Sequence, residues 1–422
     1  MFHYDFPTIR HLSDVLPVIK GREEFNVLRN EPDITIIQYE FRTCDTFPPV
    51  THFYEDVDNA ILRECRGITF RTSTGEIISR PYHKFHNLGE RSDETPDWDE
   101  RHWVLEKLDG SMVRPIPVGG DALRWATKRG VTQTALQVEQ HIAKLKRRAV
   151  MYGIMRECPP EPISDYDGFC LQMIRRGYTP IFEWCSNKQR IVVDQPTDRL
   201  VLTALRNTVF GYYASYNAML ELAKLHAIPV VRLFESVATD NLEEFVGCIR
   251  GQENNEGIVV RFLDGQMVKV KTDWYVGLHR AKSLLENERD VLRAVIEDRE
   301  DDLAPLLALE DRERLGRYAA SVRQNIRAFV FKVVRTLRWA RNAGLTRKQF
   351  ADYSVNFESF ERRAAFIAFN QLTDICAGNV VGDWVKEHVL KHLVSNKAFK
   401  TNVLPIITTR WKETSDVDTL AA

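Results

Sequence analysis

Several features that would point to particular protein classes are missing from this sequence. Lys and Arg number 58 against 59 Asp and Glu among 422 residues, so no excess charge of one sign indicates a polyanionic partner. No uncharged apolar run approaches the ~20 residues of a membrane-spanning helix, and the first ten residues lack the apolar segment of a signal peptide. A Gly-x-x-x-x-Gly-Lys-Ser/Thr loop, which binds nucleotide phosphates in polynucleotide 5′-kinases, is also absent, so the sequence does not indicate a kinase activity of this kind.

The cysteines do not form a metal-binding pattern either. They show no Cys-x-x-Cys pair and no Cys/His zinc spacing, and they lie far apart at Cys44, Cys65, Cys158, Cys170, Cys185, Cys248 and Cys376. Isolated cysteines of this kind are typical of reduced thiols in a cytosol-like compartment. We therefore expect a soluble, monomeric protein of the cytoplasm, or of the host cytoplasm if the source is a virus.

The composition is ordinary for a folded protein with two domains. Hydrophobic residues make up 44% and charged residues 28% of the chain. Up to about Trp274 short β-rich runs alternate with turns, whereas afterwards the β signals nearly vanish and helical periodicity dominates. We predict an α+β domain of antiparallel sheets with flanking helices over residues 1–278, followed by an all-α domain over residues 279–422.

The periodicity also predicts individual elements. Strands are expected at residues 34–39, 66–71, 76–80, 103–107, 112–118, 123–128, 181–184, 200–205, 230–234, 258–262 and 267–271. Helices are expected at residues 133–156, 282–298 and 312–343. Asp264-Gly265 is a strong hairpin signal between the last two strands.

The first candidate for chemistry is Lys107, in Glu106-Lys107-Leu108-Asp109-Gly110. It ends an apolar predicted strand, directly before a turn in which Gly110 would let the backbone approach a ligand. A lysine that attacks phosphorus must be deprotonated, and the phosphate must be oriented and its charge neutralised. Taken alone, the segment is equally compatible with a surface turn.

Two further lysines follow a conspicuous acidic residue. Glu256 precedes Gly257-Ile258-Val259, and the returning strand carries Lys269 and Lys271. Alternation along a strand places these two lysines on one face of the sheet. Like charges side by side repel unless an anion separates them, and a phosphate is the obvious candidate. A solvated polar face would produce the same pattern.

The order of these motifs resembles that of the covalent nucleotidyltransferases, which comprise polynucleotide ligases and mRNA capping enzymes. The shared order is Lys107-x-Asp-Gly, then Phe-Glu183-Trp, then Glu256-Gly-x-Val, then Lys269-x-Lys271. Within this group the chain is similar to the phage-type RNA ligase 1 family. The specific signs are the segments 64–70, 80–90 and 269–276, and the similarity is strongest between residues 39 and 275.

This resemblance implies an ATP-dependent RNA ligase whose first domain has an ATP-grasp-like nucleotidyltransferase fold. Lys107 would attack the α-phosphate of ATP, release pyrophosphate and hold AMP. The AMP would pass to a 5′-phosphate of RNA, and a 3′-hydroxyl would displace it to form the phosphodiester. Mg²⁺ or Mn²⁺ is expected, because pyrophosphate is a highly charged leaving group and oxygen ligands suit Mg²⁺.

The resemblance also implies roles for residues around the nucleotide. Lys269 and Lys271 would contact the α-phosphate. Arg66 and Lys84 would hold the triphosphate, with a salt bridge at a strand end as the alternative. Glu183 would accept a hydrogen bond from a ribose hydroxyl or help to bind metal.

Further residues have two open interpretations each. Glu256 would contact the lysine or a metal-bound water, or form a structural salt bridge. Tyr39 would lie near the nucleotide or in the core, and Lys128 would be a further basic site residue or an exposed turn lysine. Tyr275 would serve ligation or anchor a domain interface. Asp301 would contact metal or cap a helix.

The helical tail carries an apolar stripe beside a basic one. The cations of this stripe are Arg323, Arg327, Arg338 and Arg341, with Lys332 and Arg335 further round the helix. They could follow RNA phosphates, although a solvated helix face would look the same. In the phage-type family this region is linked to tRNA recognition. The expected partners are therefore single-stranded or nicked RNA, including tRNA under repair, with a separate 5′-kinase/3′-phosphatase preparing the ends.

Other functions remain open at this point. DNA ligases and GTP-using capping enzymes share the lysine chemistry, but they usually append an OB-fold where this chain is helical. A catalytically dead RNA-binding relative would be expected to have lost one of Lys107, Glu183, Glu256, Lys269 or Lys271, and all five are present.

Overall fold

The computed structural model describes residues 5–411 apart from 32, 41–42, 44, 51–52, 92–95, 156–157, 187–192, 194–195, 235–241, 308 and 372. Its contacts divide the chain into two compact units, Met1–Val276 and Gly277–Ala422. Each unit has a core of its own.

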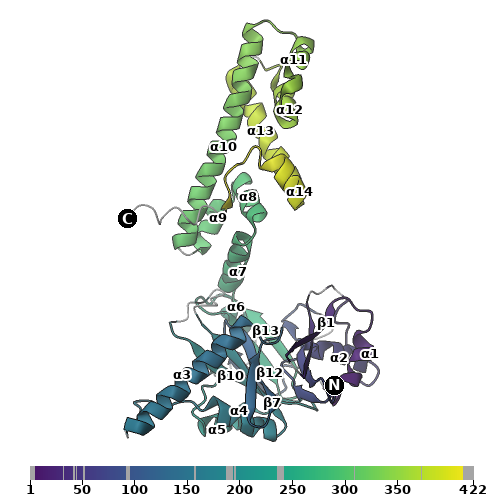
Figure 1. Cartoon of the computed structure of the whole chain (residues 1–422), viewed down its shortest axis with the longest axis vertical. Helices are drawn as coiled ribbons and strands as arrows, with labels where there is room; N and C mark the ends of the chain where they lie inside the picture. The colour runs from purple at the N-terminus through teal and green to yellow at the C-terminus, as the bar shows by residue number, and fades with distance from the viewer. Residues whose placement is uncertain are drawn as a thin grey trace. The chain divides into compact units, whose positions relative to one another are not determined.

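The first unit is built on β-sheets flanked by helices (Figure 1). Its strands are β1 (Phe25–Glu31), β2 (Ile34–Tyr39), β3 (Arg66–Arg71), β4 (Ile77–Ser79), β5 (His86–Asn87), β6 (His102–Glu106), β7 (Ser111–Gly119), β8 (Ala122–Ala126), β9 (Tyr178–Cys185), β10 (Arg199–Asn207), β11 (Leu233–Phe234), β12 (Gly257–Phe262) and β13 (Met267–Lys271). Its helices are α1 (Leu16–Ile19), α2 (Val57–Glu64), α3 (Gln133–Met155), α4 (Tyr166–Arg175), α5 (Tyr216–Lys224) and α6 (Leu242–Arg250), and α7 (Asp273–Leu285) leaves it.

The strands form three sheets. Their orders are β1-β2-β3-β4, β10-β9-β7-β8 and β11-β6-β12-β13-β5. The described pairs are antiparallel except for the short parallel pair of β13 with β5. This architecture confirms the predicted α+β class with antiparallel sheets. The connection from β6 to β7 crosses from the third sheet to the second, and it carries Lys107.

Strand β12 shows how alternation separates the core from the site. Ile258, Val260 and Phe262 lie 0–2% exposed in a hydrophobic cluster with β6 and β13. Burying such side chains contributes roughly 1.5–3 kcal/mol each. Val259 and Arg261 have the other parity and face the opposite side of the sheet.

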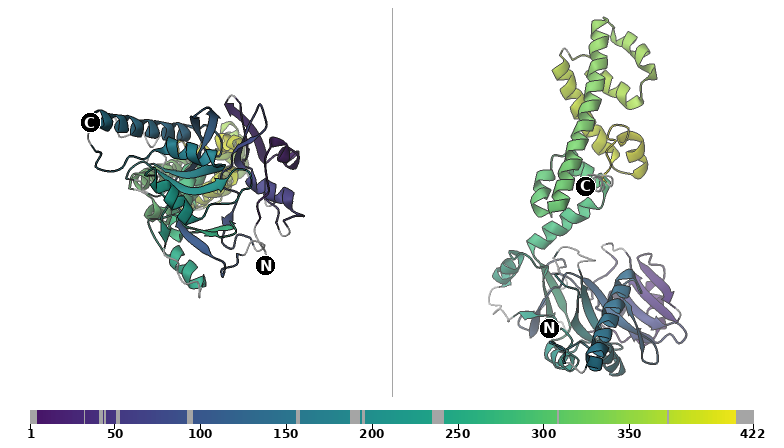
Figure 2. Two further views of the ribbon diagram at one scale, coloured as in Figure 1. Left: turned by 90° about the horizontal axis from the view of Figure 1, so that it is seen from below. Right: turned by 60° about the vertical axis from the view of Figure 1, so that its left-hand side comes forward.

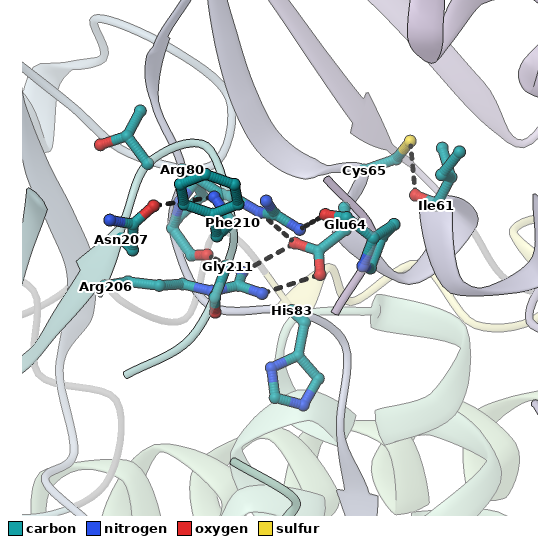
Figure 3. Close-up of polar contacts among 12 residues, drawn as sticks. Ile61, Glu64, Cys65, Arg80, His83, Arg206, Asn207, Phe210 and Gly211 are labelled. Atoms are coloured by element: carbon teal, nitrogen blue, oxygen red, sulfur yellow. Dashed lines mark hydrogen bonds and ion pairs between the residues drawn. The ribbon is translucent and has the colours of Figure 1, made fainter. Parts of the chain in front are cut away.

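A buried ion triad ties distant segments of this unit together. Figure 3 shows the Glu64 carboxylate, at the end of α2, between the guanidinium groups of Arg80 and Arg206. Arg206 donates to both Glu64 oxygens at 2.7 Å, and Arg80 Nε lies 3.1 Å from Oε2. Although burial opposes it, the two arginines lower the pKa of Glu64 to about 2. The triad fixes the segments that carry Arg66 and Lys84, each within a few residues of it.

Helix α3 is amphipathic only in its first half. Ala135, Val138 and Ile142 are buried, and the residues after Leu145 are mostly exposed. Figures 1 and 2 show this second half extending past the sheets.

The second unit is helical. Its helices are α8 (Glu288–Ile296), α9 (Glu300–Leu303), α10 (Leu309–Asn342), α11 (Arg347–Tyr353), α12 (Ser359–Ala368), α13 (Asp374–His392) and α14 (Asn396–Ala398). Its core contains Val322, Val333 and Leu337 of α10 and Val381 and Val385 of α13, all at most 3% exposed. Helices α10 and α13 lie side by side in Figure 1. None of the described helices is long and apolar enough to cross a membrane.

One helix prediction was wrong in detail. The chain does not form a single helix over residues 282–298, because α7 ends at Leu285 and α8 begins at Glu288. Asn287 is the N-cap of α8, and its side chain accepts a hydrogen bond from the backbone N–H of Arg289. A side chain that caps a new helix interrupts the preceding one.

Candidate active site

A cavity of about 240 Å³ lies between the second and third sheets of the first unit. Strands β6, β12 and β13 line one side, and β7, β9 and β10 line the other. We call it the intersheet cavity. Lys107, Asp109 and Gly110 enter it from the connection between β6 and β7. The predicted residues Arg66, Glu183, Glu256, Lys269 and Tyr275 also line it.

Lys107 lies just beyond the end of β6, where its backbone N–H donates to the carbonyl of Gly257 at 2.9 Å. Its Nζ lies 2.6 Å from Glu256 Oε2, and Lys271 Nζ lies 3.1 Å from Glu256 Oε1. Glu256 is 4% exposed, so its carboxylate is held between the two lysines. The anion predicted from the sequence, a phosphate, was expected between Lys269 and Lys271, and that stays a prediction. The anion that the structure shows is the Glu256 carboxylate, and it lies between Lys107 and Lys271.

Lys269 and Lys271 share a face of β13, as predicted from alternation, but they lie in different surroundings. Lys269 pairs with Val259 across the sheet and lines the cavity. Its Nζ lies 5.6 Å from the ring centroid of Phe85, and Arg66 stands 5.8 Å from the same ring. Burial and the charges of Arg66 and Lys107 lower the pKa of Lys269 to about 8. Such crowding of cations favours an anionic ligand here.

Glu183 projects from β9 into the same cavity. Burial raises the pKa of this carboxyl to about 8, Lys107 opposes the rise and Glu256 adds to it. A carboxyl with this environment can be neutral near physiological pH, and a bound cation would favour its ionised form.

Asp109 and Tyr275 form a buried hydrogen bond next to Lys107. The Tyr275 hydroxyl donates to Asp109 Oδ1 at 2.9 Å, and the Val193 N–H donates to Oδ2 at 2.7 Å. Tyr275 is 3% exposed. The contact orients the turn that carries Lys107. Asp109 is part of the lysine motif, but no partner for it was predicted from the sequence.

Three other predicted residues gather beside the cavity rather than in its lining. Lys128 Nζ donates to the carbonyl of Tyr39 at 2.8 Å and lies 3.9 Å from the centroid of its ring. The Tyr39 ring packs on Phe47 at 5.0 Å, and Lys84 Nζ lies 5.9 Å from the Phe47 ring while donating to the carbonyl of Phe85. Burial, with Arg66 as the next cause, lowers the pKa of Lys128 to about 8. Lys128 is therefore not a simple exposed turn lysine.

No group of three His, Cys, Asp or Glu side chains suited to a metal ion occurs among the described residues. Asp301 lies in the second unit, in the first turn of α9, and it is exposed. The alternative prediction that Asp301 caps a helix was wrong, because Arg299 holds the N-cap position of α9.

Most cations of the predicted basic stripe on α10 have acidic partners within the second unit. Arg323 pairs with Glu300, Lys332 with Glu361, and both Arg338 and Arg341 with Asp374. The described part of the chain provides no ion pair for the exposed Arg327 and Arg335. The available positive charge on this helix is thus smaller than the sequence indicated.

Arg261 lines the intersheet cavity from β12, although it was not among the site residues predicted from the sequence. Its backbone pairs with that of Trp103 on β6 and of Met267 on β13. A signal was available, because arginine interrupts the apolar strand Gly257–Phe262 at the parity of Val259. That parity predicts a side chain on the same face as Lys269.

The sequence of the chain is similar to those of known proteins. A family model described as RNA ligase matches residues 64–275. A putative RNA ligase of Thermovibrio ammonificans is 31% identical over 302 residues, covering 69% of this chain and 70% of the relative. RNA ligase 1 of Bacteriophage TS2126 is 28% identical over 351 residues, covering 80% and 79%. The structure of an archaeal ATP-dependent RNA ligase has a TM-score of 0.45 at 15% identity, covering 65% of this chain and 64% of that one.

Proposed function

The chain belongs to the RNA ligase family whose model matches its residues 64–275, and we propose that it joins RNA ends through AMP carried on Lys107. ATP is the proposed donor of the AMP. The reaction has three steps, in which the enzyme is adenylylated, AMP passes to a 5′-phosphate of RNA, and a 3′-hydroxyl displaces the AMP. The observation that carries the proposal is the position of Lys107 in the intersheet cavity, against Glu256 and close to the cations Lys269 and Arg66.

In the first step the Lys107 Nζ attacks the α-phosphorus. The ammonium must first lose one proton to solvent, because only the neutral amine has a lone pair with which to attack. The Nζ–P bond then forms as the bond from phosphorus to the pyrophosphate oxygen breaks, and the attacking nitrogen loses a second proton. Glu256 accepts that proton, since its carboxylate is within the 2.6–3.2 Å reach of a general base. Once Glu256 is neutral, Lys271 is free to turn its charge to the phosphate. Lys269 and Arg66 stabilise the negative charge that develops on the phosphate oxygens.

The remaining residues hold the nucleotide in place. Glu183 accepts a hydrogen bond from a ribose hydroxyl. Lys84, Lys128 and Tyr39, beside Arg66, bind the outer phosphates that become pyrophosphate. Asp109 and Tyr275 keep the Lys107 turn in position through their buried hydrogen bond. Positioning of this kind lowers the barrier by removing the need to orient the reactants.

A divalent cation such as Mg²⁺ or Mn²⁺ fits this set of residues. Mg²⁺ commonly uses one or two carboxylates and completes its shell with waters and substrate phosphates, so it needs no cluster of three protein ligands. Glu183 is the proposed carboxylate ligand, and Glu256 would contact a metal-bound water. The expectation that Asp301 contacts metal stays a prediction. The cation would neutralise charge on the phosphate oxygens.

The adenylylation step can be tested without RNA. The protein is incubated with Mg²⁺ and ATP labelled at the α-phosphate, denatured, and assayed for retained label. Label should remain on the wild-type chain and on Lys224→Ala, which alters an exposed lysine of α5, and should be absent from Lys107→Ala. The absence of acid-labile label on wild type would contradict the proposal, and stronger labelling by GTP would favour a capping-type enzyme.

Membership of the RNA ligase family implies an RNA substrate. A 5′-phosphorylated single strand, offered as RNA or as DNA, tests this proposal. RNA should be circularised, and equal use of the corresponding DNA would argue for a broader polynucleotide ligase. We propose tRNA repair as the biological setting, with a separate kinase/phosphatase supplying the ends.

For the second unit, Arg327 and Arg335, which have no ion pair within the described part of the chain, give a test of tRNA binding. The double variant Arg327→Gln/Arg335→Gln should weaken tRNA binding and flatten its salt dependence, because each phosphate contact contributes to the salt slope. The matched double variant Arg338→Gln/Arg341→Gln removes cations that are already paired with Asp374. It should affect tRNA binding less. Equal effects of the two variants would contradict the assignment to Arg327 and Arg335.

A further inference from the structure

Arg261 differs from the other deeply buried arginines of the first unit. Arg80 and Arg206 use every guanidinium nitrogen on Glu64 or on backbone carbonyls. Arg114 donates to the carbonyls of Gly67 and Thr127. By contrast, Nε and both terminal nitrogens of Arg261 have no hydrogen-bond partner among the described residues.

The surroundings of Arg261 leave its charge uncompensated. The side chain is 1% exposed, and its guanidinium lies 5.5 Å from the ring centroid of Trp103 and 6.0 Å from that of Tyr213. Neither the Thr203 hydroxyl, which donates to the carbonyl of Ile181, nor the Tyr213 hydroxyl, which bonds His83 Nδ1, accepts a hydrogen bond from Arg261. Aromatic faces compensate a cation only in part. Burying an unpaired charge is costly, so a protein retains one where a ligand can pair with it.

The position of Arg261 along β12 indicates which part of a nucleotide it meets. Gly257, beside Lys107 and opposite Lys271, begins the strand, and Arg261 lies four residues further on, ~13 Å away along an extended strand. The cations Arg66, Lys107 and Lys271 act on Lys269, whereas the side chains nearest the Arg261 guanidinium include the uncharged rings of Trp103 and Tyr213. Phosphates belong at the cationic end. The uncharged, aromatic end around Arg261 suits the base.

We propose that Arg261 recognises the purine base of the bound nucleotide by donating hydrogen bonds to a ring nitrogen. The inference rests on the proposed function and deepens it. A guanidinium is donor-only, so its partner in the ligand must be an acceptor. Adenine offers the ring nitrogens N1, N3 and N7, whereas its amino group cannot serve. The base thus completes the hydrogen bonding of a side chain that no described protein group satisfies.

Binding is tested on Lys107→Met protein, so that no covalent adenylate forms. Calorimetry compares this protein with Lys107→Met/Arg261→Met for ATP, for 1-deaza-, 3-deaza- and 7-deaza-ATP, and for inorganic triphosphate. We expect the Arg261 change to lower the affinity for ATP about 10- to 100-fold, which is the range for loss of a hydrogen bond to a charged group. One of the three deaza analogues should bind the Lys107→Met protein more weakly than ATP does, by about the same factor. The Arg261 change should not weaken the binding of that analogue further. Affinity for inorganic triphosphate should be unchanged.

Stability without nucleotide provides a second readout. Arg261→Met should melt at the same temperature as wild type or higher, because the uncompensated charge is gone. The matched change Arg80→Met should lower the melting temperature, because it leaves Glu64 with one arginine. Arg261→Lys keeps the charge but not the geometry of the donors. Its affinity for ATP should lie between those of the parent protein and the Arg261→Met variant.

Several results would overturn the inference. These are unchanged ATP affinity, an equal loss for ATP and inorganic triphosphate, deaza analogues that all bind like ATP, or an Arg261→Met protein that melts well below wild type. Failure of the proposed function is seen separately, as wild-type protein that takes no label from ATP.

Discussion

The Glu256 carboxylate lies 2.6 Å from the Lys107 ammonium and is almost completely buried. Glu256→Gln keeps the shape and a hydrogen-bond acceptor but removes the ability to take the proton. We expect the rate of lysyl-AMP formation to fall about 10²- to 10⁴-fold, the usual range for general-base catalysis, with little change in ATP affinity. Rapid-quench labelling measures this rate. Glu221→Gln, a surface ion-pair residue, is the matched control, and an equal rate in both variants would rule out the role of Glu256.

Glu183 gives the protein a pH-dependent stability of predictable sign. Its folded pKa is raised to about 8 from the usual 4.5. Between these values the folded state retains a proton that the unfolded chain releases, so Glu183 makes stability fall as pH rises through this window. Glu183→Gln cannot ionise. Its melting temperature should equal that of wild type near pH 4 and exceed it by a few degrees near pH 8.5, while adenylylation declines. A constant difference across pH would contradict the assignment.

Tyr275→Phe removes the donor of the hydrogen bond to Asp109. We expect the free energy of unfolding to fall by about 1–3 kcal/mol, because Asp109 loses a buried partner, and lysyl-AMP formation to slow because the Lys107 turn is less well held. Urea denaturation and the labelling assay measure the two effects. Tyr54→Phe makes the same change at a side chain 90% exposed and should alter neither quantity.

Gly110→Ala tests the close approach of the Lys107 turn to β9. A Cβ at this position would lie 2.5 Å from the carbonyl oxygen of Trp184, so β7 and β9 must shift apart. We expect adenylylation to drop at least tenfold and the melting temperature to fall. Gly153→Ala adds a Cβ that meets nothing within 4 Å, within helix α3. It should raise stability slightly, by up to ~1 kcal/mol, and leave activity intact.

Loss of any one of the four proposed phosphate-binding cations should slow adenylylation, whereas loss of Lys107 should abolish it. Replacing Arg66, Lys84, Lys269 or Lys271 by Ala removes charge from the phosphates but leaves the nucleophile. Labelling should be slower in each variant yet measurable at long times and high ATP. Complete absence of label at saturation in any of them, with the fold intact, would mean that Lys107 is not the only indispensable basic residue.

Much of the first unit could be predicted because alternation is a local property. The expected strands 34–39, 66–71 and 267–271 coincide with β2, β3 and β13. Lys107 and Glu183 belong to separate motifs and line one cavity as expected, Lys107 from just beyond the end of β6 and Glu183 from within β9. The helix break at Asn287 was missed because a cap depends on where the chain must turn, and periodicity continues past it.

Contacts between distant segments could not be predicted in the same way. Arg261 is isolated because Tyr82, Thr203 and Trp103 meet around it from three separate parts of the chain. On α10, Lys332 pairs with Glu361, and Arg338 and Arg341 pair with Asp374, across 29–36 residues of sequence. Whether a charge is paired or free is therefore a tertiary property.

The first sheet extends beyond the region that the family model matches, which matters for the design of shortened fragments. The region shared with the family begins at residue 64, yet β2 hydrogen-bonds along β3 from Ile34 opposite Arg71 to Gln38 opposite Arg66. A fragment trimmed to the shared region would leave β3 as a bare edge strand, with Ile68 and Phe70 stripped of their cover. Exposed apolar edges recruit other chains. Such a fragment would aggregate rather than serve as a minimal catalytic core.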